Sequence, residues 1–500
     1  MLPPDLLYMI FGLLHPRDLR AVVLVCRLWR EVGEAPSLWA GLRLLVTMEN
    51  RSRMQEVLVM RRLWGVRRLC ARGGKVEEEL LEAVVGHQGL RHLDLSHQEV
   101  CLDKPGLLVS VVGRMKVLDL SHTSLSSGHA RAVLAALGKV SKLETLDLRG
   151  NNLSSLEPSL LVTAASRLDS LTIANTSLTN QQADALFSAI STTSCRLRKL
   201  SVGHNNLSSV QTGLLEKALV RLEDVDLKYA SITDPQKEAI FSALGSGGST
   251  LKTLNLALVD LTALSPELML KAVKHLEDLN ISSTLNTART SQQAKAIVKA
   301  IIEAISGGCC KLRRLVTDTN TLTEVEPDLL ARAVGRLEEV NLGSTSLTSP
   351  QVCAIFAVIA TGSKLRNLNI GHNNLSAVTP ATLAKAVAGL DEVTMFVTYL
   401  TNDQMEAIFG AIDKTSRLRK LNIGGNNLSC LEPGLLARAV VELEEAILCT
   451  GVTWDQAEAI LNLSLDKTRL RKLMIGPVEG GVDGGLVARA RHKIGEVKIR

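Results

Sequence analysis

Aromatic residues are scarce in this chain: phenylalanine, tryptophan and tyrosine make up 3% of its 500 residues, whereas hydrophobic residues as a whole make up 46%. A core with so few large rings must be built from aliphatic side chains, as stacks of short strands and helices are. A single globular core stops growing at about 250–300 residues. Length and composition together therefore favour a repeat array, in which each unit contacts only its neighbours.

Paired cysteines, long apolar runs and a cationic leader are also lacking. The nine cysteines are scattered, odd in number and without a C-x-x-C spacing, which argues against a disulfide framework or a zinc site of that kind. Asp5 interrupts the apolar N-terminus, and no stretch of about 20 apolar residues exists to span a bilayer. We therefore expect no signal peptide, no membrane partner, and a location in the cytoplasm or the nucleus.

Excess charge of one sign is confined to the N-terminal part. Residues 1–75 hold 13 Lys and Arg against 6 Asp and Glu, whereas the remainder holds 44 against 45. A neutral body of this length argues against an extended nucleic-acid-binding surface. The basic positions near its start form either a solvated face or a contact for an acidic partner; they are Arg61, Arg62, Arg67 and Arg68.

One pattern recurs along the chain: L-x-x-L-x-L, with valine, isoleucine or methionine as substitutes. Apolar residues at alternate positions are typical of a short strand with one buried face. Full forms, such as residues 143–153, resemble the leucine-rich repeat, in which a ninth-position asparagine satisfies backbone groups of the following turn. The pattern begins at Leu90, Met115, Leu143, Leu168, Leu197, Leu222, Leu251, Leu276, Leu312, Leu337, Leu365, Leu390, Leu418, Leu443 and Leu470, and the asparagines are Asn151, Asn205, Asn320, Asn373 and Asn426.

The spacing of the patterns alternates, so that two repeat types form a unit of about 53 residues. This resembles the ribonuclease-inhibitor subclass, in which a helix follows every strand. Asp234-Pro235 and Ser349-Pro350 are typical helix starts. One longer step predicts a lengthened loop near residues 284–291. Four phenylalanines at one equivalent helix position are expected to fill the core: Phe187, Phe241, Phe356 and Phe409.

The fold class that these repeats predict is α/β: a leucine-rich-repeat solenoid, shaped as a horseshoe, with parallel strands on the concave face and helices outside. About sixteen strands at a spacing of ~4.8 Å would give an inner arc of about 75 Å, which suits a protein partner better than a small molecule. We expect the repeats proper over residues 90–500, and a linker with a first repeat or cap over residues 46–89.

Charges alternate from strand to strand directly after the first leucine of each pattern. Acidic pairs such as Glu338-Glu339 fall between basic positions such as Arg313-Arg314 and Arg366. Cross-strand ion pairs contribute about 0.2–1 kcal/mol each and help to fix the register of the strands. Beside this structural interpretation stands a functional one, in which the charge ladder binds a charged partner.

A few outward positions depart from the glycine, alanine or serine that most repeats carry there. Aromatic side chains flanked by small residues are typical interface anchors, although isolated exposed aromatics are also common. The candidates for contacts with a protein substrate on the concave face are Lys228, Tyr229, Phe396 and Tyr399.

No residue set predicts catalysis or a cofactor. Neither a phosphate loop nor a Ser-His-Asp or Cys-His arrangement has motif support. His97 and His122 share the eighth position of adjacent repeats, with His92 nearby, and could hold a metal, but no carboxylate or thiolate completes the set. The vicinal Cys309 and Cys310 are expected to be buried, reduced thiols. We expect neither a metal nor catalytic residues.

The first forty residues break from the repeat. Residues 2–14 predict a helix that begins after two prolines, residues 19–29 carry a second apolar stripe preceded by Asp18, and residues 36–39 begin a third short piece. Three small helices cannot bury all of this apolar surface, so a docking partner is expected to cover the remainder.

This segment resembles the F-box, whose pattern runs L-P-x-[ED]-L-L-x-x-I, then P-x-D-L, V-C-x-x-W and a closing L-W; here order and spacing agree from Leu2-Pro3 to Leu38-Trp39. The resemblance implies a small all-α domain, residues 1–45, that binds the Skp adaptor of a cullin–RING ubiquitin ligase. By position, the residues that would carry this contact are Leu2, Pro3, Leu6, Ile10, Leu14, Pro16, Leu19, Val25, Cys26 and Trp29.

Resemblance to F-box leucine-rich-repeat proteins implies a substrate-recognition subunit of a Skp–cullin–F-box ligase. The repeats would hold a protein substrate for ubiquitin-dependent degradation, and other subunits would transfer ubiquitin. Two features depart from the family pattern: the motif starts at residue 2 without a leader, and the regular alternation is closer to ribonuclease-inhibitor relatives. The alternatives are a free-standing inhibitor or immune-sensor-like binding module, with the N-terminal segment as a cap, and a GTPase-activating protein, for which no arginine stands out.

Overall fold

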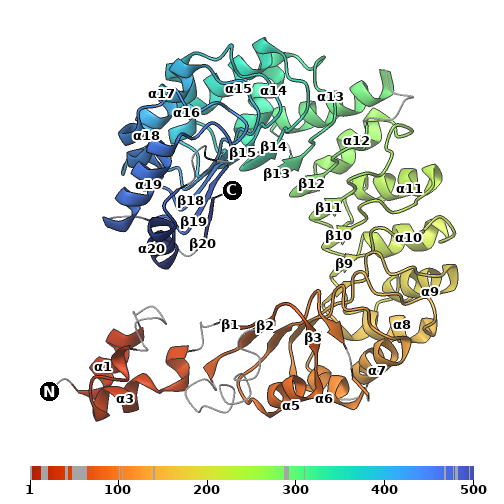
Figure 1. Ribbon diagram of the computed structural model, residues 1–500. Helices are drawn as coiled ribbons and strands as arrows, with labels where there is room; N and C mark the ends of the chain where they lie inside the picture. Colours follow the sequence, from red (N-terminus) through yellow and green to blue (C-terminus); the bar gives the residue numbers. More distant parts are fainter. Residues whose placement is uncertain are drawn as a thin grey trace. The chain divides into compact units, whose positions relative to one another are not determined.

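The structure is a computed structural model, and it describes residues 3–12, 21–39, 43–47, 65–100, 102–103, 105–138, 141–285, 292–308, 310–466, 469–476, 478, 482–494 and 496–499. The chain divides into two compact units, Met1–Ile240 (unit 1) and Phe241–Arg500 (unit 2). In each unit short parallel strands alternate with helices, and the helices cover one face of the sheet (Figure 1). The predicted α/β leucine-rich-repeat class, with a small helical segment at the N-terminus, is confirmed.

Unit 1 begins with α1 (Pro4–Gly12), α3 (Arg27–Gly33) and the 3-10 helix η1 (Pro36–Trp39). Its main strands pair in parallel in chain order, and a separate short pair joins β3 (Lys75–Val76) to β5 (Glu99–Val100). The main strands are β1 (Arg43–Val46), β2 (Arg68–Ala71), β4 (His92–Asp94), β6 (Val117–Asp119), β7 (Thr145–Asp147), β8 (Ser170–Thr172), β9 (Lys199–Ser201) and β10 (Asp224–Asp226). The helices between them are α5 (Glu78–Gly86), α6 (Gly106–Arg114), α7 (Ser127–Leu137), α8 (Pro158–Arg167), α9 (Asn180–Ile190) and α10 (Thr212–Leu219).

Unit 2 repeats the same arrangement, and its strands also pair in parallel in chain order. Helix α11 (Asp234–Gly245) contains the boundary between the units. The strands are β11 (Thr253–Asn255), β12 (Asp278–Asn280), β13 (Arg314–Val316), β14 (Glu339–Asn341), β15 (Asn367–Asn369), β16 (Glu392–Thr394), β17 (Lys420–Asn422), β18 (Glu445–Leu448), β19 (Lys472–Ile475) and β20 (Glu496–Ile499). The helices are α12 (Pro266–Val273), α13 (Gln292–Ser306), α14 (Pro327–Arg336), α15 (Ser349–Thr361), α16 (Pro380–Ala388), α17 (Asn402–Ala411), α18 (Pro433–Val440), α19 (Trp454–Asp466) and α20 (Gly484–Ile494).

The central residue of nearly every strand is a buried aliphatic side chain that faces the helices. Leu315, Val340 and Leu368, for example, lie side by side in the register of β13, β14 and β15, and all are buried. The residues on either side of each central position point away from the helices, because side chains alternate along a strand. We call the face that they form the strand face. It is the part of each unit on which binding residues were expected.

The two repeat types are held together by an asparagine that follows β7, β9, β13, β15 and β17. Asn373 Nδ2 donates a hydrogen bond to the carbonyl oxygen of Leu342 (2.8 Å), and Asn373 Oδ1 accepts one from the backbone N–H of Leu347 (3.0 Å). Both partners belong to the turn of the preceding repeat, so the asparagine satisfies backbone groups that would otherwise be buried without partners. Four further asparagines donate to the preceding repeat in the same way: Asn151, Asn205, Asn320 and Asn426.

A buried glutamine makes the complementary link in the other repeat type. Gln404 Oε1 accepts from the backbone N–H of Thr401, the residue that caps α17, and its Nε2 donates to the carbonyl oxygens of Leu375 and Val378. The same double link is made by Gln182, Gln236, Gln351 and Gln456. Each repeat type therefore completes the turn of the one before it.

The helix side of each unit is filled as the sequence predicted. The four equivalent phenylalanines are at most 1% exposed, which confirms them as core residues: Phe187, Phe241, Phe356 and Phe409. In the longest repeat, α13 takes up part of the extra length, since it has 15 residues and the equivalent α9 has 11. The remainder of the lengthened loop, residues 286–291, lies outside the described residues.

Candidate functional site

The N-terminal helices form a small core of their own. The ring of Phe11 on α1 meets Trp29 on α3 edge to face, with centroids 5.3 Å apart, and Trp39 of η1 donates its indole N–H to the carbonyl oxygen of Gly33 (2.8 Å). Leu7, Phe11 and Val22 are buried between these elements. The core is thin, as expected for so few residues, and much apolar surface is left outside it.

Most of the described residues expected to contact a Skp adaptor lie on that outer surface. Leu6, Ile10 and Val25 are exposed, as are Pro3 and Cys26. Trp29 is half-buried against Phe11, so part of its ring serves the local core. The other four candidates lie outside the described residues: Leu2, Leu14, Pro16 and Leu19.

The two most exposed large apolar residues that the structure describes on this surface were not among the sequence candidates. Leu24 is 76% exposed and Met9 is 67% exposed. Met9 follows the exposed Leu6 by three residues on α1, a spacing that places both on one helix face. That spacing was the signal in the sequence, whereas nothing near Leu24 distinguished it from a core leucine.

On the strand face of unit 1, Tyr229 is 59% exposed and follows Lys228 directly after β10. The tyrosine ring lies 5.1 Å from the ring of His204, the equivalent residue of the preceding repeat. Tyr229 has a positive φ of 54°, which the turn requires at this position of many repeats. The pair offers an exposed aromatic and a cation to a partner, and their assignment as substrate contacts stays a prediction.

On the strand face of unit 2, Phe396 occupies a place where neighbouring repeats have glycine. Its ring lies 5.2 Å from that of His372, edge to face, and a Cβ on Gly424 would lie 3.2 Å from its ring. The glycines on the adjacent strands thus leave room for the ring, which is half-exposed. Tyr399, three residues further on, is 68% exposed. These two residues also stay predicted substrate contacts.

The charge ladder on the strand face consists of cross-strand ion pairs, which confirms its structural interpretation. Arg314 pairs with Glu339 at 2.8 Å, and Lys420 pairs with Glu392 at 3.2 Å. The hydrogen bond and charge of Glu392 raise the pKa of Lys420 above its ordinary value. Because both partners of such pairs are substantially exposed, each contributes only a few tenths of a kcal/mol to about 1 kcal/mol.

The outward residue at the end of several strands differs between the units: it is aspartate in β4, β6, β7 and β10 of unit 1, and asparagine in β11, β12, β14, β15 and β17 of unit 2. In unit 1 aspartates accept the backbone N–H two residues ahead, as Asp119 does from Ser121 and Asp147 from Arg149. In unit 2 asparagines make the same bond, as Asn341 does with Gly343. The turn is therefore kept in both units, but unit 1 carries carboxylates there. Burial, and then the charge of Asp119, raise the pKa of Asp147.

The histidine pair considered as a metal site is a stack. His97 and His122 lie with their rings nearly parallel, 4.7 Å apart, and a Cβ on Gly150 would lie 2.3 Å from the ring of His122. Gly150 is thus needed to make room for that ring. The described residues contain no group of three metal-ligating side chains. Their cysteines, among them Cys310, are free, whereas Cys309 lies outside the described residues.

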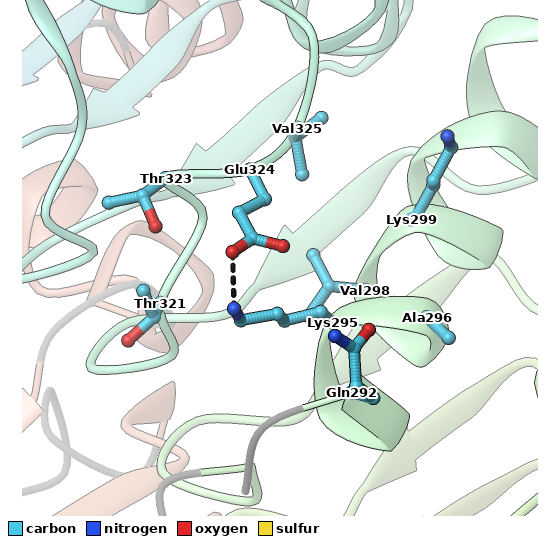
Figure 2. Close-up of a pocket in the computed structure, with 9 residues that line it drawn as sticks. All are labelled: Gln292, Lys295, Ala296, Val298, Lys299, Thr321, Thr323, Glu324 and Val325. Atoms are coloured by element: carbon cyan, nitrogen blue, oxygen red, sulfur yellow. Dashed lines mark hydrogen bonds and ion pairs between the residues drawn. The ribbon is translucent and has the colours of Figure 1, made fainter.

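A hollow of about 240 Å³ lies in unit 2 between α13 and the turn after β13. Figure 2 shows the Lys295 side chain extending across it to form an ion pair with Glu324. Lys299 pairs with Glu326 at 3.7 Å, so both lysines of this helix face are matched by carboxylates. The hollow is lined by Gln292, Lys295, Ala296, Val298, Lys299, Thr321, Thr323, Glu324 and Val325. Nothing among these residues pairs a nucleophile with a base.

A larger hollow, of about 540 Å³, opens on the helix side between α17, α18 and α19. Its lining includes Ile412, Asp413 and Lys414, which follow the end of α17 at Ala411. Phe409, Leu435 and Leu463 contribute to an apolar lining.

None of the described helices is long and apolar enough to cross a membrane.

Comparisons with known proteins agree with the motifs. A family model for F-box-like domains matches residues 1–44, and a model for the leucine-rich repeat matches residues 142–163. No match was found among curated proteins. The chain combines an F-box-like domain with leucine-rich repeats, the domain composition of an F-box leucine-rich-repeat protein.

Proposed function

We propose that this protein is a non-catalytic substrate-recognition subunit of a Skp–cullin–F-box ubiquitin ligase. The observation that carries the proposal is the F-box-like match over residues 1–44, at the end of an array of leucine-rich repeats. The F-box-like domain would bind a Skp adaptor, and through it the cullin core. The repeats would hold a protein substrate, and the complex would act in the cytoplasm, the nucleus or both.

The exposed apolar surface of the N-terminal helices supports this docking. Leu6, Met9 and Ile10 on α1 lie exposed, and so do Leu24 and Val25 before α3. Apolar side chains that gather on one small domain are typical of an interface, because burying them against a partner is favourable at about 25 cal/mol per Å². A partner of helical bundle type would cover them.

The proposed contribution of this chain to ubiquitin transfer is proximity alone. A substrate held by the repeats would meet the ubiquitin-charged enzyme of the complex at a high effective concentration. The chemistry of transfer would belong to other subunits. Phe396 and Tyr399 in unit 2, and Lys228 and Tyr229 in unit 1, are the proposed substrate contacts.

Co-purification of the full chain with a purified Skp adaptor tests the proposal. We expect a stoichiometric complex, and its loss in the double variant Ile10→Asp/Val25→Asp, because two carboxylates would be buried in the interface without partners. Both positions are exposed, so the variant should melt at the same temperature as the parent chain.

The matched control is Val109→Asp/Val162→Asp, which places two carboxylates on exposed positions of α6 and α8. This variant should bind the Skp adaptor as the parent does. Absence of a complex with well-folded parent protein would refute the ligase role. The N-terminal helices would then be a cap on the first repeat.

A further inference from the structure

From β12 to β20 the charge ladder of unit 2 is interrupted at one strand, β15. Its members are the first outward residues of consecutive strands, which the register places side by side. Acid and base alternate along this row, except that β15 carries an asparagine where a base is due. From β12 to β17 the row reads Asp278, Arg314, Glu339, Asn367, Glu392 and Lys420.

Each cation of this row lies between two carboxylates. Arg314 pairs with Asp278 at 3.1 Å and with Glu339 at 2.8 Å, and Lys420 pairs with Glu392 at 3.2 Å and with Glu445 at 4.0 Å. Among the ion pairs of the described residues, none reaches Glu339 or Glu392 from β15. The two glutamates that flank Asn367 therefore each have a cation on their far side only.

The nearest cation in the sequence is already engaged elsewhere. Arg366 precedes Asn367, but its guanidinium pairs with Asp391 at 3.4 Å. Asp391 also pairs with Arg417 at 3.2 Å. Arg366 and Arg417 thus share one carboxylate just before the strands, and neither forms an ion pair with Glu339 or Glu392.

A hollow of about 240 Å³ opens at this gap; we call it the amide hollow. It is smaller than the ~300–1,000 Å³ typical of small-molecule sites, so it suits one long side chain. The residues of its lining that bear on recognition are Arg314, Glu339, Asn341, Asn367, Asn369, Glu392 and Thr394. The guanidinium of Arg314, at the margin of the hollow, is neutralised by its pairs with Asp278 and Glu339.

Two amides of the hollow have donors to offer. Asn341 donates one of its two N–H groups to Asp318 (3.1 Å) and accepts from Gly343, so its amide is held in place on both sides. Asn369 uses only its oxygen, which accepts from the backbone N–H of Gly371. Asn367 makes no side-chain hydrogen bond with any described residue. The Nδ2 groups of Asn367 and Asn369 can therefore donate to the backbone carbonyls of an incoming chain.

Phe396, whose ring is half-exposed, follows Thr394 of the hollow's lining by two residues. A Cβ on Gly371 would lie 3.4 Å from Asn369 Oδ1 and 3.6 Å from Phe396 Cβ, so this glycine lies between the amide and the aromatic side chain. A segment that reached into the hollow would pass the Phe396 ring, which offers it an apolar contact.

We propose that the amide hollow binds one cationic side chain, arginine or lysine, of a partner polypeptide, with an apolar neighbour against Phe396. The cation lies between Glu339 and Glu392 and takes the place that Arg314 and Lys420 hold elsewhere in the row. This inference rests on the proposed function, in which the repeats hold a protein substrate, and it defines the class of substrate segment: a basic residue beside an apolar one.

The first test supplies the missing cation within the chain. Asn367→Arg should leave the melting temperature unchanged or raise it, because a guanidinium between the two glutamates repeats the arrangement of Arg314. Asn367→Gln is the neutral control. A clear fall in the melting temperature of the arginine variant alone would show that the hollow does not accept a guanidinium, and would overturn the proposal.

The second test uses fluorescently labelled heptapeptides with a central Leu-Arg-Leu, in which arginine is kept or replaced by citrulline or glutamate. The full chain should bind the arginine peptide roughly fivefold more tightly than the citrulline peptide, and bind the glutamate peptide least. The preference should survive in Asn367→Gln and disappear in Asn367→Arg, where the hollow is filled.

The variant Glu339→Gln/Glu392→Gln tests the two carboxylates that flank the amide hollow. It should no longer bind the arginine peptide more tightly than the citrulline peptide. The control Glu445→Gln/Glu496→Gln removes the same charge from the same row and should keep it. Equal binding of arginine and citrulline peptides, or no binding of the arginine peptide up to about 1 mM, overturns the inference. Binding of the Skp adaptor is measured on the same proteins. If the parent chain prefers the arginine peptide but does not bind the adaptor, the ligase role is refuted and the cation site in the amide hollow is not.

Discussion

Asn373 Nδ2 lies 2.8 Å from the carbonyl oxygen of Leu342, a residue 31 positions earlier in the chain. The contact joins one repeat to the turn of its predecessor, and Asn151, Asn205, Asn320 and Asn426 make the equivalent contact in other repeats of this type. Stability in such an array depends on interfaces between neighbours, so a single buried amide influences two repeats at once.

Removal of that amide should destabilise the protein measurably. We expect Asn373→Ala to lower the free energy of unfolding by about 2–3 kcal/mol, because buried carbonyl and N–H groups lose their partners. The control is Asn374→Ala at the next residue, whose exposed side chain bonds only to Ser376, and which should cost a few tenths of a kcal/mol. Urea unfolding followed by circular dichroism measures both, and equal effects would contradict the prediction.

A glutamate in place of the buried Gln404 should be tolerated only when its carboxyl group is protonated. In Gln404→Glu the new carboxylate would face the carbonyl oxygens of Leu375 and Val378, at a cost of about 3 kcal/mol near neutral pH. Burial raises the pKa of that carboxyl, so the deficit should shrink as the pH falls and the group binds a proton. The exposed control Glu406→Gln should show no such dependence in thermal melts across the acid range.

Replacing Asp147, at the end of β7 in unit 1, by asparagine should stabilise the protein at neutral pH. Burial and Asp119 raise the pKa of Asp147 by more than Arg149, which pairs with it at 2.7 Å, lowers it. The ionised form therefore destabilises the fold, and stability falls as the pH rises through that pKa. Asp147→Asn keeps the turn, as Asn341 does in unit 2, and should gain about 0.2–1 kcal/mol at pH 7. The gain should vanish near about pH 3, where the aspartate is neutral in both states.

The control for this prediction removes an aspartate that has no carboxylate beside it on the neighbouring strand of unit 1. Asp226 pairs in register with Ser201, so Asp226→Asn should bring no gain. Denaturant unfolding at pH 7 and at low pH compares the variants, and a gain shared by both positions would count against the repulsion between Asp119 and Asp147.

The proposed substrate contacts predict a loss of partner capture without a loss of stability. Phe396→Ala should weaken capture of a specific partner by about 1–2 kcal/mol, or roughly five- to thirtyfold. Trp454→Ala removes an exposed aromatic from α19, on the helix side, and should leave capture unchanged. Quantitative mass spectrometry of co-purified proteins compares the variants. Unchanged capture by both would remove Phe396 from the site.

Much of the fold could be predicted because it is encoded locally. The spacing of leucines determines strands such as β15, and the Thr401-to-Gln404 spacing marks a helix start. The second role of Gln404 could not be predicted, because its carbonyl partners lie 26 and 29 residues earlier and only packing of the helices brings them within reach.

The candidate site divides in the same way. The F-box resemblance identified exposed residues such as Leu6 and Val25, since each occupies a defined place in a motif, but it missed Leu24, whose exposure depends on how α1 and α3 pack.

By itself the sequence determined the repeat, its two alternating forms and the F-box-like start, because periodic side chains specify their own local structure. Only the tertiary structure decided which residues from different repeats meet. The register that places Asn367 between Glu339 and Glu392 turns an unremarked asparagine into a gap in a row of charges. The distance between strands, and not the distance along the chain, determines whether those carboxylates share a cation.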